Sequence, residues 1–170
     1  MAKFSISEAE YKRRITHIKK VLVRRKLDAL YLTSTTSIFY LTGYSFLATE
    51  RPAALIIPAD GKITFMGPLL ERDHIPLKTR IIEEVKTYLD YPGEKHPIDY
   101  FVDFLKEMGL AKKRIGIDNK AGAAAMWGYK GPPITRKLPE AKFVNMKDLV
   151  PSMRLIKSEE EIALIRESAK

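Results

Sequence analysis

The sequence contains no cysteine, and this absence excludes several kinds of site. Without thiols there can be no disulfide, no thiolate metal ligand and no cysteine nucleophile. The absence also fits a reducing compartment, and we expect a cytoplasmic protein. Glutamine is missing as well, and asparagine occurs only at Asn119 and Asn145, whereas lysine and glutamate are abundant. Because this balance is typical of thermophilic proteins, we expect a thermophilic source.

The motifs that would mark a catalytic centre are missing too. The histidines, His17, His74 and His96, are isolated from one another, and no His-Glu-x-x-His pattern occurs. Asp73 beside His74 and Asp99 near His96 are single pairs, which do not make a metal site. His96 is better placed to cap the helix that follows it. No phosphate-binding glycine loop and no nucleophile elbow is present. We therefore expect no catalytic residue and no metal ligand in this chain.

Apolar targeting segments are also lacking. The N-terminal residues do not include the apolar stretch of a signal peptide. Residues 29–49 carry no charge, but they contain eight serines or threonines and Gly43, which makes them a poor membrane span. We interpret them as a buried strand, a turn and a short helix, and we expect no membrane partner.

The chain is basic, with a net charge of +9. Nucleic acid is the usual partner of such a chain. Here the excess is spread, because residues 1–60 contribute +5 and residues 61–170 contribute +4. Eight basic residues do cluster between Lys12 and Lys26. They favour either a phosphate-binding helix or the solvated face of an amphipathic helix. We prefer the second interpretation and expect no nucleic-acid partner.

The composition suits one globular domain of 170 residues, since 45% of the residues are hydrophobic and 30% are charged. Apolar spacing and turn residues predict an alternation of strands and helices. Strands are predicted at 27–33, 53–57, 62–66, 80–85, 114–118 and 141–144. Helices are predicted after Ser7, at 69–75, from Pro97 towards Gly109, at 121–127 (as a helix or a turn), before Pro151 and after Ser158. With a hairpin at residues 58–61, this order favours an α/β layered domain with a mixed sheet.

Two capping boxes mark helix starts. Ser7 with Glu10 opens the first helix, and we expect the Glu10 side chain to reach back to the Ser7 amide. Ser158 with Glu161 opens the last helix, which has no stop signal before Lys170. A helix this short is marginal alone. We therefore expect residues 153–170 to begin a further domain, and residues 1–152 to form the first one.

Three segments together resemble the creatinase, prolidase and Xaa-Pro aminopeptidase family. Residues 37–44, Ser-Ile-Phe-Tyr-Leu-Thr-Gly-Tyr, are similar to the family signature Asn-Ile-x-Tyr-Leu-Thr-Gly-aromatic. Ser37 replaces the usual asparagine, and serine can cap a short helix as asparagine does. Arg51 before the strand at 53–57, which ends in Pro58 and a glycine turn, is the second match. The third is residues 153–162, similar to the Arg-x-x-Lys-Ser-x-x-Glu-Ile junction that opens the pita-bread catalytic domain.

The resemblance implies the N-terminal, non-catalytic domain of a metal-dependent Xaa-Pro dipeptidase or aminopeptidase, with the catalytic domain absent. It implies a ribonuclease H-like fold of about six mixed strands flanked by helices. It also implies two divalent metals (manganese, cobalt or zinc) in the missing domain, held by two Asp, one His and two Glu, none of which lies in this sequence. The partners that it implies are the catalytic domain, a second subunit in a homodimer, and a proline-containing peptide.

The resemblance further suggests that this domain serves oligomerisation and gates or binds substrate at a partner subunit's active site. The loop after Gly43 is the candidate region, with Tyr44, Phe46, Glu50 and Arg51 as candidate substrate-binding residues acting in trans. The local alternative is that the aromatic rings pack in the core and that Arg51 pairs with Glu50. The alternative function is a stand-alone, non-catalytic protein-binding module of the same fold.

The depletion of glutamine, cysteine and asparagine generates a first prediction. The thermal midpoint of unfolding, followed by circular dichroism, is expected above the window of ~45–65 °C that is typical of mesophilic domains. A midpoint inside that window would contradict the interpretation of the composition.

Overall fold

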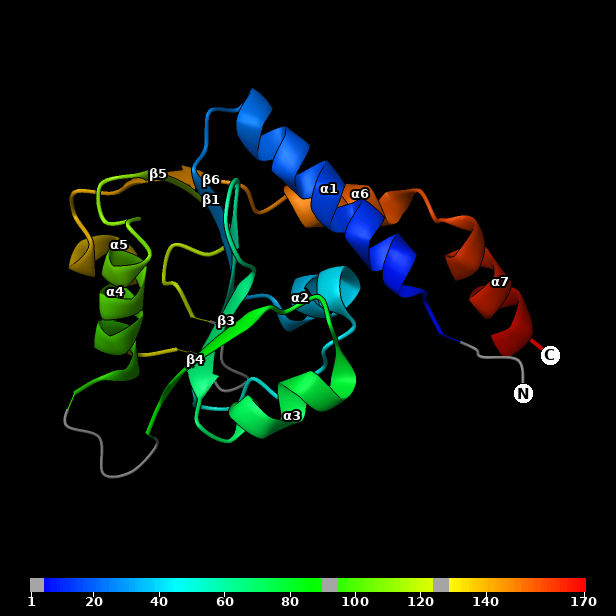
Figure 1. Cartoon of the computed structure of the whole chain (residues 1–170), viewed down its shortest axis with the longest axis horizontal. Coiled ribbons are helices and arrows are strands. Elements are labelled where there is room, and N and C mark those ends of the chain that lie inside the picture. Colours follow the sequence, from blue (N-terminus) through cyan, green and yellow to red (C-terminus); the bar gives the residue numbers. More distant parts are fainter. Residues whose placement is uncertain (1–4, 90–94, 124–128) are drawn as a thin grey trace.

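The computed structural model describes residues 5–89, 95–123 and 129–170, and its centre is a mixed β-sheet (Figure 1). Within the described residues six strands are hydrogen-bonded in the order β4-β3-β2-β1-β5-β6, as the predicted fold class requires. The strands are β1 (Ala29–Leu32), β2 (Ala54–Pro58), β3 (Thr64–Pro68), β4 (Glu84–Tyr88), β5 (Arg114–Ile117) and β6 (Lys142–Asn145). The helices are α1 (Glu8–Arg24), α2 (Thr35–Thr42), α3 (Glu71–Lys78), α4 (Pro97–Glu107), α5 (Ile134–Lys137), α6 (Leu149–Leu155) and α7 (Glu159–Ser168).

Strand β1 lies in the middle of the sheet and changes its direction of pairing. It runs antiparallel to β2 on one side and parallel to β5 on the other. Strands β2 and β3 form the predicted hairpin, and β4 and β6 add parallel edges. Because all four residues of β1 are buried, this strand belongs to the core on both faces.

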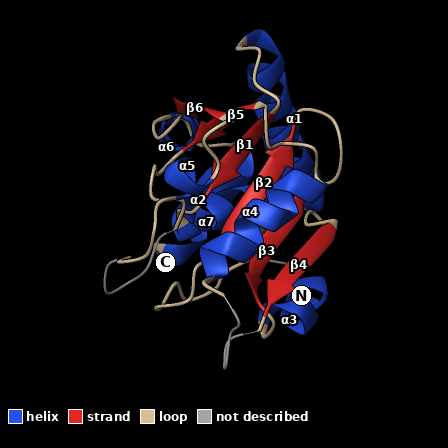
Figure 2. Cartoon of the chain, turned by 90° about the vertical axis from the view of Figure 1, so that its left-hand side faces the viewer, coloured by secondary structure: helices blue, strands red, loops and turns tan. Residues whose placement is uncertain are grey.

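Helices cover both faces of the sheet (Figures 1 and 2). Leu30 and Leu32 of β1 face one side, where they pack with the buried faces of α1, α2, α3 and α6. Ala29 and Tyr31 face the other side, with residues of α4 and α5. This alternation is the period of two that a strand imposes on its side chains. The molecule is therefore a three-layer α/β domain.

Several helix boundaries agree with the local signals. The Ser7 side chain caps α1 by accepting from the Glu10 amide at 3.1 Å. Pro97 stands at the start of α4, where the Nδ1 atom of His96 accepts from the Ile98 amide at 3.2 Å, so the predicted cap is confirmed. Ser37 does not have the capping role that we expected. Ser34 caps α2 instead, because helical geometry begins at Thr35 and leaves Ser37 inside the first turn.

The fourth strand lies later in the sequence than the predicted range of 80–85. Ile81 and Ile82 are buried in the core next to α1 and α2, so their apolar character suggested a strand. Pairing with β3 starts only at Glu84, opposite Thr64. The apolar residues Ile81 and Ile82 therefore indicated a segment that packs in the core. The edge strand that follows, Glu84–Tyr88, is mostly polar and half-buried.

Helices α3 and α6 each contain a proline, and both extend beyond the ends that were predicted for them. Helix α3 runs to Lys78 and includes Pro76, beyond the predicted end at residue 75. Helix α6 begins at Leu149 and contains Pro151 in its first turn, where a missing amide costs no helical hydrogen bond.

The predicted domain boundary at residues 152–153 falls inside α6 and stays a prediction. Of the helix or turn predicted at 121–127, residue 121 lies in a turn and residue 122 in a bend, and 124–127 lie outside the described residues.

Asp118, directly after β5, ties three elements together. Its carboxylate accepts from the amides of Thr33 and Ser34, each at 2.9 Å, and from the Thr33 hydroxyl at 3.0 Å. These residues end β1 and start α2. The position of α2 on the sheet is thus fixed by a charged acceptor that comes from a neighbouring strand.

Helix α7 lies at the edge of the molecule, beside the N-terminal end of α1 (Figure 1). Its predicted capping box is complete, since Ser158 accepts from the Glu161 amide and Glu161 accepts from the Ser158 amide. None of its residues is fully buried. No helix in the described ranges has both the length and the apolar composition that a bilayer crossing needs.

Candidate functional site

The candidate loop at 43–51 starts at a glycine that the geometry requires. Gly43 ends α2 with φ +74°, a left-handed conformation that glycine adopts without strain. A Cβ atom at this position would lie 2.9 Å from the hydroxyl oxygen of Tyr11. The end of α2 is therefore packed against α1, and the loop leaves from a fixed point.

The two aromatic residues of the loop pack on the sheet. Tyr44 is 1% exposed, and its ring stacks near that of Phe46 with centroids 5.9 Å apart. Both rings meet Phe65 of β3 edge to face, at 5.6 and 5.4 Å. Such pairs add to the stabilisation that burial provides. The structure thus places Tyr44 in the core, and Phe46 half-buried against it.

Tyr44 also makes a buried polar contact that sequence reasoning missed. Its hydroxyl donates a hydrogen bond to the carboxylate of Glu71, which is 8% exposed. Burial and this bond raise the pKa of Tyr44. Nδ1 of His74 lies 3.9 Å from the same carboxylate. One signal was available: Glu71 and the buried Ile75 are four residues apart, so they share the core face of α3.

Glu50 and Arg51 lie at the outer end of the loop. The Arg51 Nε atom is 3.7 Å from Glu50 Oε1, and their side chains are 38% and 53% exposed respectively. The backbone amide of Glu50, and to a smaller extent Arg51, lower the pKa of the Glu50 carboxyl. This ion pair is the local alternative that the sequence left open for Arg51. Whether Arg51 binds substrate stays a prediction.

A surface groove of about 420 Å³ lies beside this loop. Three of the four predicted residues line it together with residues of α3: Tyr44, Phe46, Arg51, Leu70, Glu71 and His74. Glu50 does not line the groove, but it forms an ion pair with Arg51, which does. The groove has an aromatic floor, and Arg51 and His74 supply nitrogen donors. Such a surface can hold a small anionic or amphipathic group.

Metal ligands do not gather in the described part of the chain. No group of three histidine, aspartate or glutamate side chains with suitable spacing occurs among residues 5–89, 95–123 and 129–170. Glu71 and His74 are only a pair, and one pair does not hold a divalent ion.

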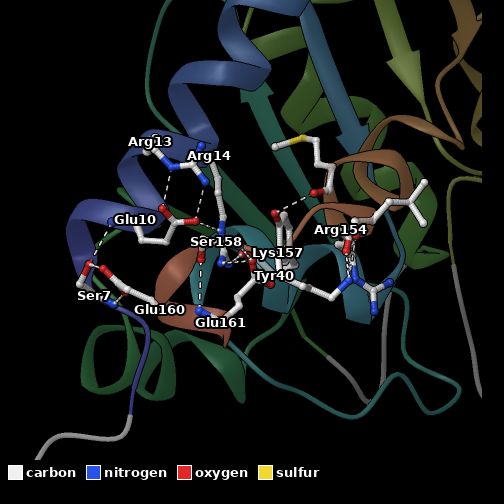
Figure 3. Close-up of polar contacts among 12 residues, drawn as sticks. Ser7, Glu10, Arg13, Arg14, Tyr40, Arg154, Lys157, Ser158, Glu160 and Glu161 are labelled. Carbon is white, nitrogen blue, oxygen red and sulfur yellow. Dashed lines mark hydrogen bonds and ion pairs between the residues drawn. The ribbon is translucent and has the colours of Figure 1, made fainter. Parts of the chain in front are cut away.

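A second polar cluster joins α1 to α7 (Figure 3). The expectation that Glu10 would reach back to Ser7 is wrong. The Glu10 carboxylate binds Arg13 at 2.6 and 2.8 Å and Arg14 at 2.9 Å, because two guanidinium groups lie one turn further along the helix. These bonds, from Arg13 first and then Arg14, lower the pKa of Glu10 to about 2. The Ser7 amide donates instead to Glu160 of α7, at 2.7 Å.

Comparison with known proteins identifies the family. Residues 14–156 match the model of the creatinase/prolidase N-terminal domain. An uncharacterized hydrolase/peptidase, y4tL, of Sinorhizobium fredii is 31% identical over 174 residues, covering 95% of this chain and 42% of that protein. The chain spans about two fifths of the length of the curated relatives that it matches.

Solved structures show the same fold. A proline dipeptidase from Streptococcus pneumoniae superposes with a TM-score of 0.65 at 26% identity, covering 84% of this chain and 98% of that one. A prolidase from Thermococcus sibiricus gives a TM-score of 0.71 at 21% identity, covering 94% of this chain and 40% of that one. At 21% identity, the similarity to the Thermococcus sibiricus prolidase supports the fold alone.

The Tyr44–Glu71 contact predicts a stability effect. Tyr44→Phe should lower the free energy of unfolding by about 1–3 kcal/mol, because the buried carboxylate loses its donor. Chemical denaturation measures this change. Tyr100→Phe is the matched control, since Tyr100 is half-buried and its hydroxyl makes no hydrogen bond with the described residues, and it should change stability by less than about 0.5 kcal/mol. Equal stability of wild type and Tyr44→Phe would contradict the role of the bond.

Glu10 predicts a dependence of stability on pH. Its pKa is about 2 in the folded chain, against the ordinary 4.5, so its contribution is complete above about pH 4.5 and is lost as the pH falls towards 2. In denaturant titrations, the stability difference between wild type and Glu10→Gln should therefore shrink between pH 5 and pH 2. Glu159→Gln, on an exposed glutamate, serves as the control. A Glu10→Gln difference that is independent of pH would refute the assignment.

Proposed function

The chain belongs to the creatinase/prolidase N-terminal domain family, and from this premise we propose that it is the non-catalytic domain of a metal-dependent Xaa-Pro peptidase. In this proposal the domain assists dimerisation, and it binds or gates substrate at the active site of a second subunit. The catalytic domain, an Xaa-Pro dipeptidase or aminopeptidase, would be a separate part of the same protein. The substrate would be a peptide with proline after the scissile bond.

The names and lengths of the relatives support this proposal. The Streptococcus pneumoniae protein is a proline dipeptidase, and the matching protein of Sinorhizobium fredii is a hydrolase or peptidase. This chain corresponds to about two fifths of its curated relatives, and the matching model describes an N-terminal domain. A role beside a catalytic domain fits both observations.

The two divalent metals implied by the family do not fit the described residues. A dinuclear site needs several anionic ligands that converge. No such set is present within the described ranges, and the buried carboxylates of Glu10 and Glu71 and the half-buried carboxylate of Asp118 accept hydrogen bonds from neighbouring groups. We therefore assign no metal to the described residues and derive no catalytic step from them.

The observation that carries the substrate proposal is the groove beside loop 43–51. Its lining includes Tyr44, the last residue of the signature motif, and its aromatic residues are held by the sheet. Held rings keep the outer end of the loop in one place, so that Arg51 is presented from a rigid base. Arginine and aromatic residues are enriched where proteins recognise partners.

The proposed ligand of Arg51 is a carboxylate of the peptide substrate. A guanidinium group can bind a carboxylate through two parallel hydrogen bonds. In the free domain Arg51 lies 3.7 Å from Glu50, and ion pairs between such exposed groups contribute little. Loss of this one ion pair would therefore cost little.

Removal of Arg51 tests the proposal in the protein that includes the catalytic domain. Arg51→Ala should lower kcat/KM by about 10- to 150-fold, which corresponds to ~1.5–3 kcal/mol for one charged hydrogen bond. The thermal midpoint should stay unchanged, because Arg51 is partly exposed.

Arg72→Ala is the matched control, since Arg72 is an exposed arginine on the nearby helix α3. It should leave both kinetics and stability at wild-type values. Unchanged kinetics in a well-folded Arg51→Ala protein would rule out the substrate role. A loss of activity that parallels a loss of stability would make Arg51 a structural residue instead.

A further inference from the structure

Helix α7 is attached to the domain by polar contacts at its first turn. None of its residues is fully buried, and Ile165 is 54% exposed. The non-helical link from α6, residues 156–158, adds little packing, since Ile156 is 86% exposed. Burial of apolar surface normally fixes a helix on a domain. In α7 only a few apolar side chains, such as Ile162 and Leu164, are half-buried, so polar contacts must contribute to fixing the direction of the helix.

The first attachment is a helix cap supplied by another helix. The two carboxylate oxygens of Glu160 accept from the amide and the hydroxyl of Ser7, both at 2.7 Å. In an ordinary capping box, the side chain of the glutamate three residues after the cap accepts a hydrogen bond from the backbone amide of the cap residue. That residue, Glu10, is engaged by Arg13 and Arg14. Helix α7 thus completes the N-terminal cap of α1 from a position 153 residues away (Figure 3).

The second attachment is a buried guanidinium group. Arg14 is 2% exposed, its Nε atom donates to Glu10, and a terminal nitrogen donates to the Tyr40 carbonyl oxygen at 2.6 Å. The group also lies 3.9 Å from the centre of the Tyr40 ring. Helices α1 and α2 therefore hold Arg14 without any help from α7.

The remaining Arg14 nitrogen is directed towards α7. It makes no hydrogen bond within the described residues, and Glu161 Oε2 is 3.4 Å away, an ion pair rather than a hydrogen bond. Glu161 is held in turn by its own capping box with Ser158. A fixed buried cation facing a fixed carboxylate favours one relative orientation of the two helices, because a buried charge is costly when left without a partner.

We propose that Ser7 and Arg14 form a preformed carboxylate-docking site for the first turn of α7, and that Glu160 and Glu161 are the positioning residues that set the direction in which the chain leaves this domain. The attachment is electrostatic, so it is releasable. Its consequence for catalysis rests on the proposed function: if α7 continues into a catalytic domain, the site sets the angle between the two domains. The docking itself does not depend on that function.

The absence of cysteine makes a distance measurement straightforward. We would introduce spin labels at Ala163→Cys in α7 and Lys106→Cys in α4, two exposed positions on separate elements, in the 170-residue chain. Pulsed electron resonance then gives the distribution of distances between them. A single narrow distribution is expected at low salt.

Glu160→Ala removes the trans cap, and Glu159→Ala is its control in the same turn. Glu160→Ala should raise the detached population at least about tenfold, the effect of losing one charged hydrogen bond, and Glu159→Ala should leave the distribution unchanged. Glu160→Gln, which keeps the side-chain volume, should act in the same direction, and circular dichroism checks that each variant is folded. A distribution that is unaltered by Glu160→Ala, or equally broadened by Glu159→Ala, would overturn the proposal, and either result would leave the proposed peptidase function untouched.

Discussion

The carboxylate of Asp118 connects the sheet to the candidate loop at 43–51 and to the attachment of α7. By accepting from the amides of Thr33 and Ser34, it fixes the point where β1 ends and α2 begins. Helix α2 then has two consequences. Its last residue leads through Gly43 into the candidate loop, and its Tyr40 carbonyl oxygen holds Arg14. The groove beside loop 43–51 and the proposed docking site of α7 therefore depend on the same short helix.

Carboxylates that are buried or half-buried in this domain are matched by specific donors. Asp118 is bound by backbone amides, Glu71 by the hydroxyl of Tyr44, and Glu10 by two arginines. A buried charge without such partners would be strongly destabilising. These groups are consequently engaged in holding the fold. Arg51, the residue proposed to act on another molecule, is partly exposed at the surface.

Local chemistry in the sequence predicted much of the fold. Ser7, Pro97 and Ser158 marked helix starts, and the turn at 58–61 marked the hairpin, because caps and turns depend on neighbouring residues. The contacts that organise the site join residues far apart in the chain, such as Asp118 with Thr33 and Ser7 with Glu160. A local rule assigned the Ser7 amide to Glu10, and it could not anticipate a glutamate from α7. The candidate loop was identified through a resemblance, whereas Glu71 became evident only when α3 was seen against the sheet.

The central claim is that this domain serves a peptidase site which it does not itself contain. The most direct test is the hydrolysis of an Xaa-Pro dipeptide with added manganese, measured for the 170-residue chain and for the protein that includes the catalytic domain. The account predicts hydrolysis by the longer protein and none by the 170-residue chain. Turnover by the 170-residue chain alone would contradict it.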